Sequence, residues 1–120
     1  MKINEKSNSL MIKMEHGDNL FEIVGQIIKK YRITEAWIRG FGFASMIEYG
    51  LIEKTEPMFL KKNKVDELVT VNSITANSYE DQITFNFSGM SVKGVTHIGR
   101  LLNLTVAHEM DLIIEIIRTE

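Results

Sequence analysis

The sequence predicts an α+β domain in which one main helix packs on a highly curved, largely antiparallel sheet of about seven or eight strands. One stretch, residues 20–31, has clear helical periodicity. Most of the remaining chain alternates with a period of two or is rich in β-branched residues. Glycines interrupt the apolar stretch 36–50, which is typical of a strand that bends or lies close to another backbone. One helix and many strands indicate the α+β class.

Two elements are predicted at the start of the chain. Residues 10–15 alternate imperfectly and form a strand. A helix is expected over residues 20–31, because its apolar residues recur at the spacing of one helix face. Asp18 or Asn19 is the expected N-cap, and the helix is expected to end near residues 31–32.

The middle of the chain is predicted to be extended. Residues 36–43 are a near-continuous apolar run, which is typical of a strand covered on both faces. A second strand is expected over 46–53, and a short edge strand over 58–62, where lysines discourage edge pairing. Strands 68–76 and 82–88 form a hairpin, since turn residues separate them.

The last segment allows two interpretations. Residues 101–107 and 112–117 are apolar and β-branched, and we expect two strands joined by a bulge. The alternative is a helix over 97–106, because Leu101 and Leu104 also fit a helical stripe.

Length and composition limit the class of protein. The chain has 120 residues, and we expect a flexible N-terminus over residues 1–8 and a single domain over 9–118. No apolar run reaches the ~20 residues of a membrane helix, and the polar N-terminus lacks the apolar core of a signal peptide. The chain has no cysteine, which excludes disulfides and thiolate metal sites and favours a cytoplasmic location.

The charge balance argues against a nucleic-acid-binding domain. The formal net charge is −2, from 14 basic and 16 acidic residues, whereas DNA-binding domains usually carry a basic excess. The densest basic cluster is Lys61, Lys62 and Lys64, and it is followed directly by Asp66 and Glu67. A solvated turn explains this cluster better than a phosphate-binding patch does.

Three motifs in this order resemble a known family. Residues 15–18, Glu-His-Gly-Asp, are similar to the residues that lead into the family's single long helix. Residues 37–45 resemble its apolar-x-Gly-x-Gly-small strand, and residues 84–86 with the later segment 99–102 have the spacing of its His-x-His … Gly-Gly-His-Leu signature. The chain therefore resembles the PPC (plants and prokaryotes conserved, DUF296) domain over nearly its whole length. The resemblance implies a stand-alone, homotrimeric domain, of the kind named as DNA-binding without an assigned activity.

The departures from the family pattern concern its metal site. The three histidines that form a metal site in some prokaryotic members correspond by spacing to Thr84, Asn86 and Arg100. Threonine is a poor zinc ligand, an amide is a weak one, and arginine repels a cation. We therefore expect no metal and no cofactor in this chain. The AT-hook that accompanies the domain in plants is also missing, which argues against direct DNA binding.

The same positions are candidates for a different kind of site. Thr84 and Asn86 lie on the polar side of one predicted strand, and Arg100 lies on its expected neighbour. If this side faces a cleft, their hydroxyl, amide and guanidinium groups could bind a polar or anionic ligand. His97 and Glu48 complete the candidate set. The alternative is a solvent-facing side of a strand that binds nothing, and no catalytic residue is assigned.

Two functions from different classes follow from these observations. The first is a homotrimeric interaction module with no membrane partner. Large apolar side chains such as Phe41, Phe43, Phe85 and Phe87 are more than one helix can cover, so the open face of the sheet is expected to lie against further copies. The second is a small-molecule binding protein or enzyme with its site in a cleft between subunits.

Overall fold

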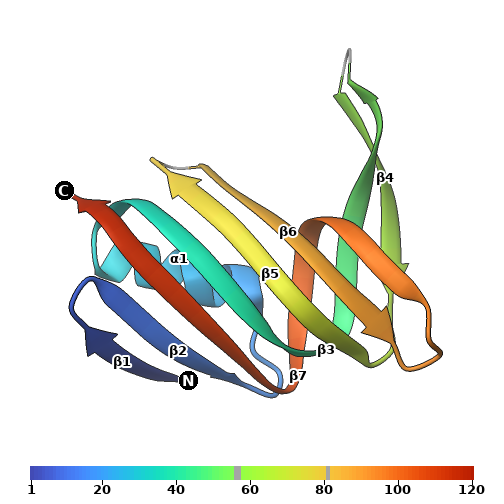
Figure 1. Ribbon diagram of the computed structural model, residues 1–120, viewed down its shortest axis with the longest axis horizontal. Helices are drawn as coiled ribbons and strands as arrows, with labels where there is room; N and C mark the ends of the chain where they lie inside the picture. The colour runs from blue at the N-terminus through green and yellow to red at the C-terminus, as the bar shows by residue number, and fades with distance from the viewer. Residues whose placement is uncertain (56–57, 81) are drawn as a thin grey trace.

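The computed structural model describes residues 1–55, 58–80 and 82–120 (Figure 1). Within these ranges the chain forms one helix and one antiparallel sheet of seven strands, which confirms the predicted fold class. The helix is α1 (Leu20–Lys30), and the strands are β1 (Lys2–Lys6), β2 (Ser9–Glu15), β3 (Ile33–Thr55), β4 (Met58–Val65), β5 (Val69–Tyr79), β6 (Gln82–Ser91) and β7 (Thr96–Thr119).

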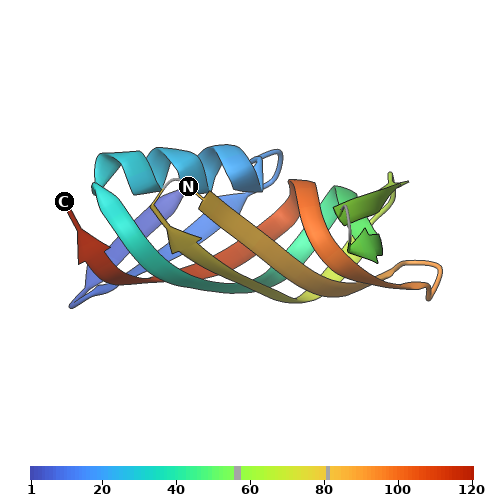
Figure 2. The same cartoon turned by 90° about the horizontal axis from the view of Figure 1, so that it is seen from above.

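Two very long strands, β3 and β7, organise the sheet. They pair with each other along almost their whole length, from Ile33 opposite Thr119 to Gly50 opposite Arg100. The first half of β3 also pairs with β5 and its second half with β4, while the two halves of β7 pair with β6 and β2. The sheet therefore curls, and at one end its strands rise toward the side on which α1 lies (Figure 2).

The bend of each long strand has a local cause. On β3, the register shifts around Gly42, where an added Cβ would lie 2.6 Å from the Cα of Met110. On β7, His108 has a φ of +64°, a left-handed conformation that is costly for a residue with a side chain. The backbone N–H of His108 donates a hydrogen bond to Nδ1 of His16 at 3.0 Å, which satisfies the donor that the bend removes from the sheet.

Helix α1 covers the inner face of the sheet. Its N-cap is Asn19, whose side-chain Oδ1 accepts hydrogen bonds from two backbone N–H groups of the first turn. Leu20, Val24 and Ile27 are buried against the strands, and each buried aliphatic side chain contributes about 2 kcal/mol. The ring of Phe21 packs edge-on against the ring of Phe85, with 4.9 Å between the two ring centroids. The core thus lies between α1 and the inner face.

Several expected boundaries differ from the structure. The strands expected over 36–43 and 46–53 form one strand, β3, and those expected over 101–107 and 112–117 are both part of β7. The strand Lys2–Lys6 lies within the N-terminal segment that was expected to be flexible, and it pairs with β2. Short charged strands of this kind show little apolar alternation, so the sequence pattern does not reveal them.

The alternative helix over 97–106 is wrong, and a β-bulge explains why the pattern suggested one. The register of β7 against β3 shifts between Tyr49 and Glu48, which pair with Leu101 and Asn103. This shift lets Leu101 and Leu104 both turn inward and become buried, although they are three positions apart. A bulged strand therefore imitates the spacing of a helix face. No helix in the described ranges is long and apolar enough to cross a membrane.

Candidate functional site

Three of the five candidate residues come together on the outer face, the surface of the sheet turned away from α1. Thr84 and Asn86 alternate with the buried Phe85 and Phe87 on β6, so their side chains point outward. Arg100 on β7 is directly opposite Asn86 in the register. Side chains of opposed residues lie on the same face of a sheet, so the three positions form one polar group.

The other two candidates lie elsewhere. His97 packs against Tyr49, whose ring contacts Phe87 in the core, and a hydrogen bond of 2.8 Å joins the Tyr49 hydroxyl to Nδ1 of His97. Nε2 of His97 is buried and has no hydrogen-bond partner in the described part of the chain. Glu48 lies on the second half of β3, opposite Asn103 and a lysine of β4. His97 therefore points toward the core, away from the group formed by the first three.

A cavity of about 640 Å³ lies beside Thr84 and Asn86 on the outer face. Two rows of opposed residues cross it. One row contains Glu115, Trp37, Asn77 and Thr84, and the other contains Arg39, Thr75 and Asn86. In the described part of the chain, these polar side chains make no hydrogen bond or ion pair with one another, so they are available to a ligand or a partner.

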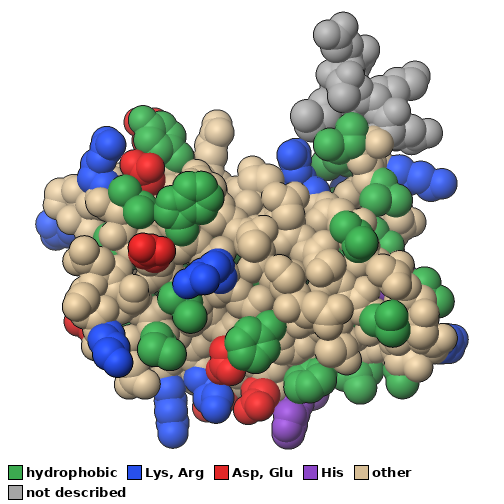
Figure 3. Space-filling model, in the orientation of Figure 1, with side chains coloured by type: hydrophobic (Ala, Val, Ile, Leu, Met, Phe, Trp, Pro, Cys, Tyr) green, Lys and Arg blue, Asp and Glu red, His purple; other side chains and the backbone are tan. Residues whose placement is uncertain are grey.

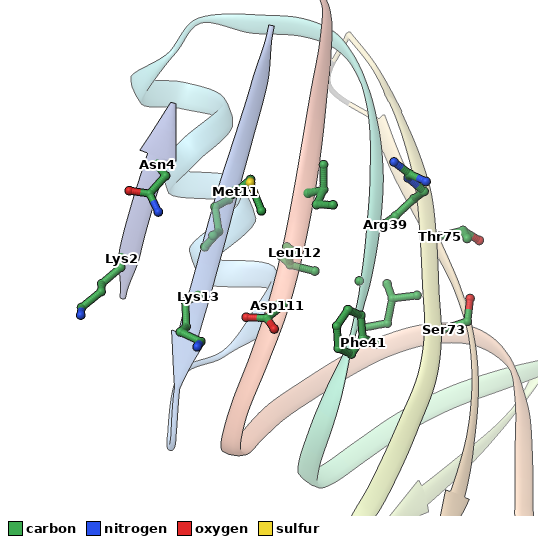
Figure 4. Close-up of a pocket in the computed structure, with 14 residues that line it drawn as sticks. Lys2, Asn4, Met11, Lys13, Arg39, Phe41, Ser73, Thr75, Asp111 and Leu112 are labelled. Carbon is green, nitrogen blue, oxygen red and sulfur yellow. The ribbon is translucent and has the colours of Figure 1, made fainter. Parts of the chain in front are cut away.

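A second cavity, of about 700 Å³, adjoins the first across Arg39 (Figure 4). It lies over β1, β2, β7, β3 and β5. Side chains of Met11 and Phe41 give it apolar walls together with Ile113, while Lys2 and Lys13 contribute positive charge.

The outer face carries large apolar side chains that the sequence pattern did not assign to it. Trp37 is 53% exposed, Phe41 is 58% exposed and Met11 is 47% exposed. Figure 3 shows this face, with green apolar patches among blue and red charged side chains. The run 36–43 was expected to be covered on both faces, but Trp37, Arg39 and Phe41 alternate with buried or glycine positions. That alternation is the signal that could have identified the outward set.

The group at Thr84, Asn86 and Arg100 does not fit a divalent metal ion. It offers one hydroxyl, one amide and one cation, whereas metal ions in proteins are held by carboxylate, imidazole or thiolate groups. Elsewhere in residues 1–55, 58–80 and 82–120, no three His, Asp or Glu side chains meet in a way that could hold one. What the group can do is exchange hydrogen bonds with a polar molecule.

The fold is shared with several solved structures. A "putative DNA binding protein" from Bacteroides thetaiotaomicron superposes with a TM-score of 0.88 at 12% identity, over 96% of this chain and 82% of that one. A protein of the same description from Ralstonia eutropha gives 0.84 at 19% identity, over 98% and 84%. A plant- and prokaryote-conserved (PPC) protein from Pyrococcus horikoshii gives 0.79 at 17% identity, over 99% and 83%.

The fold is the PPC fold. At these identities the likeness extends to architecture alone. No family model matches the sequence, and no curated protein matches it either. The comparisons therefore establish the fold of this chain and assign it no activity.

Proposed function

We propose that this chain is a stand-alone member of the PPC family that acts as a homotrimeric interaction module, and that its outer face joins the copies. The observation that carries the proposal is the exposure of both Trp37 and Phe41 on the face of the sheet that is turned away from α1. Large exposed aromatic patches of this kind are typical of protein interfaces.

The two edge strands of the sheet, β1 and β4, are poorly suited to pairing with a strand of another copy, which favours a contact through the outer face. β1 begins and ends with lysine, and β4 carries Lys61, Lys62 and Lys64. Lysines along an edge strand hinder pairing with a further strand. The exposed apolar side chains of the outer face can be buried by a second copy without any strand pairing.

The charges of the outer face also suit a second copy of the same chain. Lys13 and Arg39 lie on it together with Asp111 and Glu115, so both signs are interspersed (Figure 3). A surface of mixed sign can complement a copy of itself, whereas phosphate groups require a positive excess.

Size-exclusion chromatography with light scattering tests the proposal. We expect a mass about three times the 13.8 kDa of the single chain, and a monomer would overturn it. Phe41→Glu places a charge in the centre of the outer face and should give a monomer. Val92→Glu is the matched control, because Val92 is even more exposed but lies in the turn between β6 and β7, and this variant should still assemble.

Direct DNA binding has less support in this chain, although two proteins of the same fold are named for it. The basic cluster on β4 is partly neutralised, since Nζ of Lys64 lies 3.8 Å from a carboxylate oxygen of Asp66. We expect no retention on heparin or on a DNA column at low salt, and retention there would indicate that the chain binds DNA.

A second candidate function, binding of a small polar or anionic ligand, is favoured by the cavity of about 640 Å³ and its unpaired polar side chains. Thermal-shift measurements with inorganic phosphate, citrate and glucose test it. We expect at least one probe to raise the melting temperature of the wild type and to lose this effect in Asn86→Ala. Thr70→Ala is the control, since Thr70 is exposed on β5 outside this cavity. No shift with any probe would contradict this function.

A further inference from the structure

We infer that the copies pack head to tail, with the indole of Trp37 of one copy inserted into the cavity beside Phe41 of the next. This inference rests on the proposed function, because it requires that the outer face joins copies of the chain. It adds a specific contact, a direction and a site that only a partner subunit completes.

Trp37 has the properties of an anchor side chain. It is 53% exposed on β3, and its indole N–H has no hydrogen-bond partner in the described part of the chain. An exposed tryptophan is unfavourable in a monomer, but it is among the residues that contribute most to binding when a pocket encloses it. Its neighbour on β7 is Glu115, which makes no ion pair within the described residues.

The cavity of about 700 Å³ has the properties of the matching pocket. Met11, Phe41 and Ile113 provide an apolar wall for an indole ring, while Ser73 and Asp111 provide oxygen atoms that could accept its N–H (Figure 4).

Trp37 and the cavity are separate parts of the outer face. Trp37 and Phe41 are four positions apart on β3, about 13 Å along a strand, and Arg39 lies between them. Trp37 therefore does not reach the cavity of its own chain, and it does not line it. A contact between two different patches can repeat from copy to copy, and it closes into a ring of three when successive copies are rotated by a third of a turn, which is the geometry of a cyclic trimer.

The charged side chains on the outer face also favour head-to-tail packing. The carboxylate on the Trp37 side of the face is Glu115, whereas the cavity side carries Lys2 and Lys13 with one carboxylate, Asp111, and Arg39 lies between the two sides. Head-to-tail packing brings the Glu115 carboxylate toward the lysines of the next copy. Packing that sets the Trp37 sides of two copies against each other would instead bring Glu115 toward Glu115, which like-charge repulsion disfavours.

Two variants test the direction of the contact. Trp37→Ala removes the anchor, and Met11→Trp fills the cavity while keeping Trp37. Each variant alone should lose assembly, with an apparent dissociation constant raised at least about thirtyfold, as expected for an interface anchor. Leu68→Ala, which trims an exposed apolar side chain near the opposite end of β5, should assemble as the wild type does.

The decisive measurement is the mass of an equimolar mixture of the two variants. Trp37 of the Met11→Trp chain can still enter the open cavity of the Trp37→Ala chain, so the mixture should give a dimer of about twice 13.8 kDa and no larger ring. Circular dichroism confirms that each variant is folded. A wild-type assembly that Trp37→Ala leaves unchanged, or a mixture that stays monomeric, would overturn the head-to-tail contact alone. A monomeric wild type would overturn the proposed function with it.

Discussion

At the scale of single residues, Tyr31 connects the end of the helix to the first strand. Its hydroxyl donates a hydrogen bond to a carboxylate oxygen of Glu5 at 2.8 Å. This hydrogen bond, followed by burial and by the negative charge of Glu5, raises the pKa of Tyr31 above its ordinary value of 10.0. The contact therefore stabilises the folded state below pH 10 and is lost as the pH rises through the folded-state pKa.

An alkaline titration checks this behaviour. The difference in phenolate absorbance between wild type and Tyr31→Phe isolates Tyr31, and its midpoint should lie above 10.0. Glu5→Gln removes both the carboxylate acceptor and its charge, so the midpoint should fall toward the ordinary value. Equal midpoints in wild type and Glu5→Gln would contradict the assigned cause.

The exposed side chains of β3 could have been predicted from the sequence by strand alternation, but not from its hydrophobic content. Ala36 and Ile38 are buried, whereas Trp37, Arg39 and Phe41 are exposed, which is ordinary strand alternation. Hydrophobic content alone suggested a strand covered on both faces, because exposed aromatic residues cannot be told from core residues by composition. The spacing of the family signature grouped Thr84, Asn86 and Arg100. The sequence could not predict which face of the sheet they lie on or that a cavity lies beside Thr84 and Asn86.

At the scale of elements, the close crossing of β3 and β7 is the feature with the clearest energetic consequence. An added Cβ at Gly42 would lie 2.6 Å from the Cα of Met110 and 2.7 Å from the carbonyl oxygen of Glu109. Both contacts involve backbone atoms, which cannot rotate away as a flexible side chain can.

Gly42→Ala should therefore destabilise the protein by about 2 kcal/mol or more, measured by urea unfolding. Gly25→Ala is the matched control, since Gly25 lies in α1 and its added Cβ would meet no atom within 4 Å. Alanine favours a helix interior over glycine, so this control should stabilise the protein by about 0.5–1 kcal/mol. Equal effects of the two substitutions would show that β3 can move away from β7.

The two kinds of element differed in how well the sequence predicted them. The helix was located closely because its cap and its apolar stripe are local signals, and Asn19 is the cap in the structure. The continuity of β3 and β7 could not be predicted. It depends on pairing between residues distant in sequence, such as Ile38 opposite Ile114, and no local pattern records such pairing.

At the scale of the whole molecule, association through the outer face should couple stability to protein concentration. Unfolding of a trimer to separate chains is favoured by dilution, so the melting temperature should rise with concentration, by roughly 4 °C for each tenfold increase for a chain of this length. Differential scanning fluorimetry over a hundredfold range of concentration measures this slope.

Phe41→Glu serves as the control for this slope, because a monomer has a melting temperature that does not depend on concentration. A wild type with the same melting temperature at every concentration would contradict association through the outer face. A slope that persists in Phe41→Glu would show that the copies meet through another surface.

The position of β7 between β2 and β3 has a consequence for synthesis on the ribosome. Within the described residues β2 pairs only with β1 and β7, so the N-terminal hairpin cannot join the remaining strands until β7, which is translated after the other six strands, has emerged. Until then the nascent chain exposes two incomplete sheets, each with an unsatisfied edge. Such late, long-range closure is expected to be slow, and it makes newly made chains dependent on protection from aggregation.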